Sequence, residues 1–311
     1  MEFEQTIRQP VGCSGIGLHS GAPVSLRILP AAAGAGVLFR RVDLEGFEVE
    51  AVGRNVAKVS YATSLMKKGV LISTTEHLLS AFIGLGVDNA IVELDNLELP
   101  ILDGSAQPFV EMVLRAGLKP QRRKRIYWRI LKEVEVRDGD KFIALYPADG
   151  YSVSYAIDFP HPLIGKERFE VELMARTAGG VSHLDGDFYR RDIAAARTFG
   201  FLHEAQKMRE MGLIRGASEE NAIVLTRDGI ANGPLRYDDE FVRHKVLDLI
   251  GDLALLGHRI LGRVVADRAG HAMHIALVSR LLRDHTLWEA VTLEKNAATG
   301  ISRPSEAAVT T

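Results

Sequence analysis

FVRHKVLDLIGDLALL, residues 241–256, is the stretch that decides the fold. Its apolar residues recur at helical spacing, which predicts a helix over Phe241–Leu256. His244, Asp248 and Asp252 are each four residues apart, so they fall on one face of that helix, within about 80°. The other faces are apolar. The sequence therefore predicts a helix that is buried on most sides and carries a polar stripe.

The polar stripe sets a requirement on whatever packs against it. Two buried carboxylates without partners are costly, so we expect a cation beside Asp248 and Asp252. A divalent metal is one candidate, and an arginine or a protonated histidine is another. Gly251 lies on the same face, and a glycine there permits close approach of a second segment.

A second amphipathic helix is predicted over Ser73–Leu85, with a serine or threonine cap and Glu76 in its first turn. Zinc accepts imidazole and carboxylate ligands, so His77, His244 and Asp248 could form a three-ligand site. Glu76 could then take a proton from the attacking water. From spacing alone, two other interpretations stay open: a structural His–Asp pair, and first-turn residues that complement the helix dipole.

The rest of the chain alternates between strand and helix patterns, so each half could form one layer of a sheet plus helices. Strands are expected at Pro23–Pro30, Gly36–Arg40, Phe47–Val52, Ala90–Leu94, Arg129–Val136, Lys141–Pro147, Ser152–Phe159 and Ile260–Ala266, and further helices at Pro108–Ala116, Asp187–Ala196 and Ala272–Arg283. The basic run Gln121–Arg125 is interpreted as a solvated linker rather than a phosphate or membrane patch. A linker at this position divides the chain into domains at 1–124 and 125–296, with a disordered tail expected at 297–311.

Composition narrows the function classes. The hydrophobic and charged fractions, 47% and 25%, are those of a globular protein, and a net charge of −2 gives no general attraction to nucleic acid. Cys13 is the only cysteine, so a disulfide framework and a cysteine metal cluster are excluded. We expect no secretory signal and no integral membrane segment, which fits a cytoplasmic protein.

Seven motifs occur in an order that resembles one enzyme family. They are Gly15–Gly21, Ser73–Ala81, Gly86–Asn89, Leu102–Ala106, Ala196–Phe201, Phe241–Leu253 and Gly270–Ala272. Together they resemble the UDP-3-O-acyl-N-acetylglucosamine deacetylases, zinc enzymes of lipid A synthesis, from about Gln5 to about Val291. The resemblance implies two α+β domains that pack helix layer to helix layer, with the active site between them.

The resemblance also implies a reaction and roles for particular residues. The reaction is zinc-dependent hydrolysis of the N-acetyl group of an acylated UDP-sugar, with iron(II) as an alternative metal. The implied roles are metal ligands (His77, His244, Asp248), general base (Glu76), oxyanion and leaving-group histidine (His271) with its carboxylate partner (Asp252), oxyanion hydroxyl (Thr198) and substrate contacts (Phe199, Lys245). The expected partner is the small-molecule substrate, and the expected oligomeric state is a monomer.

Two departures and two alternatives accompany this resemblance. His274 stands where the family usually has asparagine, and the connection Arg176–Gly186 is longer than usual. The alternatives are a deacetylase of a different acylated amino sugar and a non-catalytic zinc-binding relative. The second would be expected to lack Glu76, Thr198 or His271, and the sequence has all three.

Overall fold

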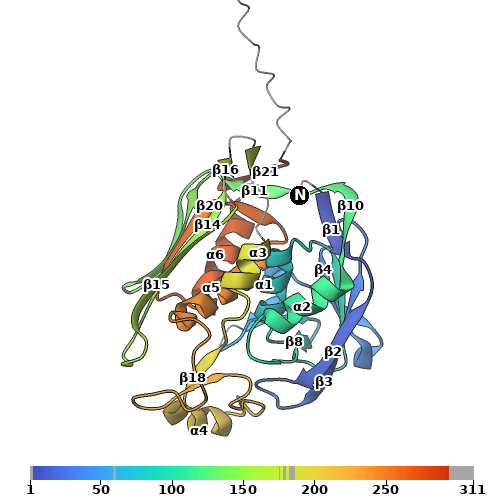
Figure 1. Ribbon diagram of the computed structural model, residues 1–311. Helices are drawn as coiled ribbons and strands as arrows, with labels where there is room; N and C mark the ends of the chain where they lie inside the picture. Colours follow the sequence, from blue (N-terminus) through green and yellow to red (C-terminus); the bar gives the residue numbers. More distant parts are fainter. Residues whose placement is uncertain (1–2, 59–60, 175, 178–179, 182–185, 294–311) are drawn as a thin grey trace, which may run out of the picture.

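The structure is a computed structural model that describes residues 3–58, 61–174, 176–177, 180–181 and 186–293. Helices lie in the middle with a sheet on either side of them, apart from α4 (Leu202–Glu210), which lies at the lower end of the molecule (Figure 1). This is the α+β arrangement that the family resemblance implies. The expected tail at 297–311 and most of the connection Arg176–Gly186 lie outside the described residues.

One layer is a five-stranded sheet built from the first part of the chain. Its order is β2 (Val11–Ile16), β3 (Pro23–Pro30), β9 (Ala90–Leu94), β4 (Val37–Arg41) and β5 (Phe47–Glu50). In β3 the side chains alternate between exposed and buried, so one face of the sheet turns toward the helices. Those helices are α1 (Glu76–Leu85) and α2 (Gln107–Ala116).

The opposite layer is a seven-stranded sheet. Its strands are β11 (Tyr127–Ile130), β12 (Val134–Asp138), β13 (Lys141–Pro147), β14 (Tyr151–Phe159), β15 (Gly165–Met174), β20 (Arg259–Asp267) and β21 (Trp288–Val291). β20 is central and pairs with β11, β13 and β14. The helices α5 (Glu240–Leu253) and α6 (His271–Arg283) lie against this sheet (Figure 1).

Shorter elements complete the described chain. They are β1 (Phe3–Ile7) with β10 (Leu118–Lys124); β6 (Val56–Lys58), β7 (Ser64–Lys67) and β8 (Val70–Ile72); β16 (Arg176–Thr177) with β17 (Gly180–Val181); β18 (Phe199–Phe201) with β19 (Ile223–Leu225); α3 (Gly186–Asp192); α4 (Leu202–Glu210); and the 3-10 turns η1 (Val42–Leu44), η2 (Gly53–Asn55) and η3 (Ala254–Leu256).

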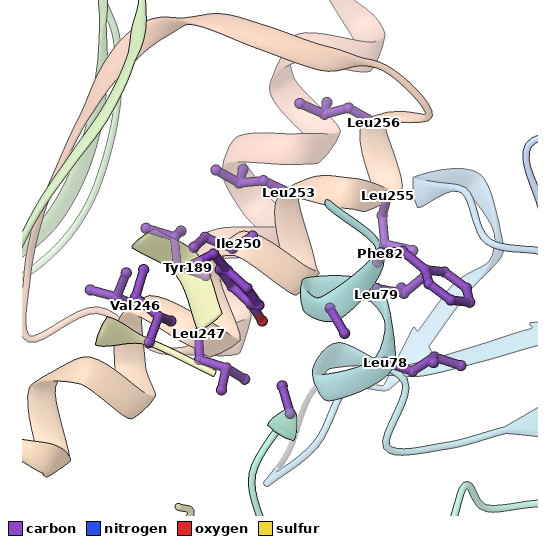
Figure 2. Close-up of a cluster of buried hydrophobic side chains, with 14 of the residues drawn as sticks. Leu78, Leu79, Phe82, Tyr189, Val246, Leu247, Ile250, Leu253, Leu255 and Leu256 are labelled. Carbon is purple, nitrogen blue, oxygen red and sulfur yellow. The ribbon is translucent and has the colours of Figure 1, made fainter. Parts of the chain in front are cut away.

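The core forms where α1 and α5 meet between the sheets. α1 and α5 pack against each other, and their buried apolar side chains belong to one hydrophobic cluster that also includes Tyr189 of α3 (Figure 2). Gly251 of α5 lies directly against the backbone of Glu76: a Cβ built at this glycine would be 2.0 Å from the Glu76 carbonyl oxygen. The close approach that the sequence predicts at Gly251 is therefore confirmed, and it brings the two polar helix segments together.

Three of the predicted elements are wrong in extent or kind. The run Gln121–Arg125 is not a loose linker, because its first four residues belong to β10, which pairs antiparallel with β1. Arg125 itself is buried, and its guanidinium donates to Asp88. The predicted strand Arg129–Val136 is two strands, β11 and β12, with the exposed Leu131 between them.

The third difference is the helix predicted over Asp187–Ala196. It ends at Asp192, and Ala196 follows in an irregular segment that contributes a backbone carbonyl to the site described below. We propose that the domain boundary nevertheless lies near residue 124, where β10 ends and the chain passes to β11.

Candidate functional site

The first part of the candidate site lies at the N-terminus of α1. Glu76 and His77 are its first two residues, and both side chains are buried. Thr74, two residues earlier, has φ of 58°, which is unusual for a β-branched residue. Its hydroxyl donates to Glu98 Oε1 at 2.9 Å and so supports this conformation. Backbone strain of this kind clusters at functional sites.

The second part lies on α5, where His244 and Asp248 are one helical turn apart. His244 Nε2 is 3.4 Å from Asp248 Oδ1, and His77 Nε2 reaches the same oxygen at 3.7 Å. The three side chains are buried, and they offer ligand atoms within 4.8 Å of one another. Ligand atoms about 2.0–2.1 Å from a tetrahedral zinc ion lie about 3.4 Å apart. The trio that the sequence singles out therefore comes together with separations that suit a bound metal.

His244 is held in the protonation state that a metal ligand needs. Its Nδ1 donates to the Ala196 carbonyl at 3.0 Å, which leaves the Nε2 lone pair directed at Asp248. Burial lowers the pKa of His244 to about 3, so the ring is neutral at neutral pH. A neutral imidazole with a fixed tautomer is pre-arranged to bind a cation.

Glu76 lies beside this trio with its carboxylate fixed. The Thr63 backbone N–H donates to Glu76 Oε2 at 3.1 Å. Burial raises the pKa of Glu76, which makes the carboxylate more ready to accept a proton than a solvated one.

His271 and Asp252 form the pair that the resemblance implies. His271 Nδ1 is 2.7 Å from Asp252 Oδ2, and its Nε2 is 3.8 Å from Asp248 Oδ2. Burial opposes a charge on His271, but Asp252, with smaller effects from Asp248 and Glu76, outweighs it and raises the pKa to about 9. The histidine thus begins α6 as a cation directed at the trio, with Asp252 behind it. Asp248 has a cation beside it as well, because Lys245 Nζ is 2.6 Å from Asp248 Oδ2. Each carboxylate of the polar stripe therefore has a cationic partner, as the sequence predicts.

Of the remaining predicted residues, Phe199 and Lys245 contact the trio, and Thr198 lies two residues after Ala196. Phe199 packs against Phe241 with ring centroids 5.0 Å apart and lies 6.5 Å from the ring of His244. Lys245 Nζ lies 5.9 Å from the Phe199 ring but is engaged with Asp248 in this structure. Thr198 precedes Phe199 and is held by backbone hydrogen bonds to Gly104 and Ile223.

Two residues of the site carry no signal in the sequence. Thr63 Oγ1 donates to Asp252 Oδ1 at 2.6 Å, while its backbone holds Glu76. Tyr155 of β14 places its hydroxyl 3.1 Å from His274 Nε2. Thr63 directly precedes β7 and Tyr155 lies within β14, and only the tertiary fold brings them to the site.

The described part of the chain has no helix with both the length and the hydropathy needed to cross a bilayer. Residues 4–283 match the model of the family LpxC, described as UDP-3-O-acyl N-acetylglycosamine deacetylase.

Curated relatives agree with this match over nearly the full chain. A UDP-3-O-acyl-N-acetylglucosamine deacetylase of Solibacter usitatus (strain Ellin6076) is 50% identical over 299 residues, which cover 96% of this chain and 97% of the relative. Proteins of the same name are 46% identical in Anaeromyxobacter dehalogenans (strain 2CP-C), covering 90% of this chain and 88% of the relative, and 43% identical in Cellvibrio japonicus (strain Ueda107), covering 94% of each. With a match of this extent around a buried His–His–Asp trio, the chain belongs to the LpxC family of UDP-3-O-acyl N-acetylglycosamine deacetylases.

Proposed function

We propose that this protein hydrolyses the N-acetyl group of UDP-3-O-(3-hydroxyacyl)-N-acetylglucosamine and releases acetate, an early committed step of lipid A synthesis. The observation that carries the proposal is the buried trio of His77, His244 and Asp248 with the buried Glu76 carboxylate next to it. In the proposed reaction, water adds to the amide carbonyl, the C–N bond breaks, and the amine leaves with a proton. We further propose that the protein works as a monomer in the cytoplasm.

The donor set fits a zinc ion. Two imidazoles and one carboxylate, with separations of 3.4 and 3.7 Å to the shared oxygen, are the ligands expected of a catalytic zinc site with one open position. When bound, the ion would polarise the amide carbonyl and make water a better nucleophile. Iron(II) suits the same ligands, so the donor atoms favour zinc without excluding iron.

Glu76 is proposed as the general base. It adjoins His77 in the chain, and its raised pKa brings its proton affinity closer to that of the water it must deprotonate. The Thr63 N–H restrains one carboxylate oxygen, so the other is left to face the substrate.

His271 is proposed to stabilise the negative oxygen that forms when water adds to the amide. As a cation supported by Asp252, it presents Nε2 on the side of Asp248. A preorganised donor at such an oxygen contributes about 3 kcal/mol to transition-state stabilisation. Thr198 is proposed as a second donor. The amine requires a proton to leave, and both Glu76, once protonated, and His271 can supply one.

Phe199 and Lys245 are proposed as substrate contacts. Phe199 offers an aromatic surface that packs on Phe159 at 5.6 Å and on Phe241 at 5.0 Å, so its ring is held in place. For Lys245 to bind a sugar hydroxyl or a phosphate, its ammonium group must move from Asp248 Oδ2 toward the substrate.

The proposal is tested by acetate release from the purified protein. We expect turnover with the UDP-linked, 3-O-acylated substrate, and turnover at least about tenfold lower with a 3-O-acyl-N-acetylglucosamine that lacks UDP, because phosphate contacts are then lost. Equal turnover of the two compounds would indicate a deacetylase of a different acylated amino sugar. No acetate from either compound would contradict the proposed function.

A further inference from the structure

His274 is fully buried and engages both of its ring nitrogens. It lies three residues after His271 on α6, so the two rings share one face of that helix, with centroids 6.0 Å apart. Its Nδ1 is 2.8 Å from Asp252 Oδ2, and its Nε2 is 3.1 Å from the Tyr155 hydroxyl. A fully buried imidazole with a polar partner on each side is restrained in both position and orientation.

The neighbouring groups fix which atom carries the hydrogen. Burial opposes a charge on Asp252, but the positive charge of His271 and hydrogen bonds from the two histidines outweigh it and lower the pKa of Asp252 to about 2, so this carboxylate only accepts. Burial lowers the pKa of His274, so the ring is neutral, and its single hydrogen lies on Nδ1 and is donated to Asp252. The Tyr155 hydroxyl donates its one hydrogen to the Ala269 carbonyl at 2.6 Å, and its oxygen lies 3.1 Å from His274 Nε2.

Asp252 is consequently held by three donors. Thr63 Oγ1 donates to Oδ1 at 2.6 Å, while His271 Nδ1 and His274 Nδ1 donate to Oδ2 at 2.7 and 2.8 Å. An ionised carboxylate oxygen has two lone pairs, so Oδ2 can accept from both histidines. Removing His274 would free the carboxylate to rotate about the two remaining bonds, and His271 would follow it.

Asp252, His271 and His274 could also be considered as a second metal site, because they offer ligand atoms close together. Their contacts argue against this. Both Nδ1–Oδ2 distances are those of direct hydrogen bonds, whereas ligand atoms around a tetrahedral ion lie about 3.4 Å apart. The cluster is a hydrogen-bonded network that ends at His271.

We propose that His274 is a positioning residue for deacetylation, which holds Asp252 so that Oδ2 stays directed at His271 Nδ1. The inference rests on the roles of Asp252 and His271 in the proposed function. It adds His274, which has no role in that proposal. His274 acts through Asp252 and does not touch the substrate. Its contribution should therefore affect kcat and leave KM almost unchanged.

Two substitutions of His274 separate positioning from packing. In His274→Asn, the amide nitrogen is attached to Cγ, as Nδ1 is, so the donor to Asp252 is retained and the contact with Tyr155 is lost. In His274→Gln, the amide lies one bond further out, near the place of Nε2, so the Tyr155 contact is retained and the Asp252 donor is lost. Asparagine is also the smaller residue, so packing alone would make it the more damaging change.

We expect kcat for acetate release to fall by roughly 10- to 100-fold in His274→Gln, because Asp252 no longer keeps the His271 ring in its orientation. In His274→Asn we expect a loss of less than about threefold, with KM and metal content like those of the parent in both variants. His285→Gln makes the same chemical change at an exposed histidine and serves as the control. Thermal unfolding of each variant gives the cost in stability separately.

The result that would overturn the inference is a His274→Gln variant with the parent's kcat, or an asparagine variant less active than the glutamine variant. A His271→Ala variant separates this from failure of the proposed function. If His271→Ala retains the parent's turnover, the role of His271 is wrong and the inference falls with it. If His271→Ala is inactive while His274→Gln is fully active, only the inference fails.

Discussion

Gly251→Ala is the substitution whose effect the structure predicts most sharply. A helix interior normally gains about 1 kcal/mol from a glycine-to-alanine change, so helix propensity alone predicts a more stable protein. Here the new Cβ would lie 2.0 Å from the Glu76 carbonyl oxygen and 2.7 Å from the Glu76 carbonyl carbon. An ordinary van der Waals contact is about 3.5 Å, so α1 and α5 would have to separate locally by roughly 1.5 Å.

This separation should affect stability and activity together. Both obstructing atoms belong to the backbone of a buried helix and cannot rotate away. Overpacking of this kind costs about 1–3 kcal/mol, which exceeds the gain from propensity. The shift also moves Glu76 and His77 relative to His244, and a misplacement of about 1 Å can cost on the order of 100-fold in rate.

Chemical denaturation, metal analysis and acetate release measure the three consequences. We expect a lower midpoint of unfolding, weaker metal retention and a kcat about 100-fold lower. Gly229→Ala is the matched control, because the nearest atom to a Cβ there is Thr226 Oγ1 at 3.5 Å. A Gly251→Ala protein that is as stable and as active as the parent would refute the account of how the two helices meet.

Three further predictions concern Glu76, His77 and Glu167. Glu76→Gln should retain metal and lower turnover by about 100-fold or more, and unchanged turnover would remove Glu76 as the base. His77→Ala should weaken metal affinity by more than about 100-fold in equilibrium dialysis, and an unchanged dissociation constant would remove it from the ligand set. Burial raises the pKa of Glu167 from 4.5 to about 7. The folded state therefore binds this proton more tightly, and its stabilising effect is lost as pH rises from 4.5 to 7. Since Glu167 is half exposed, we discount the effect to about 1 kcal/mol. Glu167→Gln should reduce the loss of stability between pH 5 and pH 8 by that amount, and identical pH profiles would disprove the assignment.

Local periodicity predicts the two helices that carry the site. The pattern at 241–256 gives α5 and the turn η3 that follows it, and the pattern at 73–85 gives α1. Both helices are long enough, and apolar enough on defined faces, for spacing to specify them. The requirement for a cation beside Asp248 and Asp252 also follows from spacing and burial, without knowledge of the fold.

The elements that sequence analysis misses depend on pairing rather than periodicity. β10 is a run of mostly exposed basic residues and has no alternation, so only its backbone pairing with β1 makes it a strand. Within the site, Thr63 is nearly 190 residues from Asp252 in the chain, and no local pattern can predict their contact. His274 is a partial success. The sequence marks it as unusual, but its two partners, Asp252 and Tyr155, are visible only in the fold.

The central claim is that the trio of His77, His244 and Asp248 holds a metal on which amide hydrolysis depends. Its most direct test is acetate release by the purified protein before chelation, after chelation, and after return of one equivalent of zinc. The account predicts that chelation abolishes turnover and that one equivalent of zinc restores it in the parent protein. A metal-stripped protein that continues to release acetate at the original rate would contradict the claim.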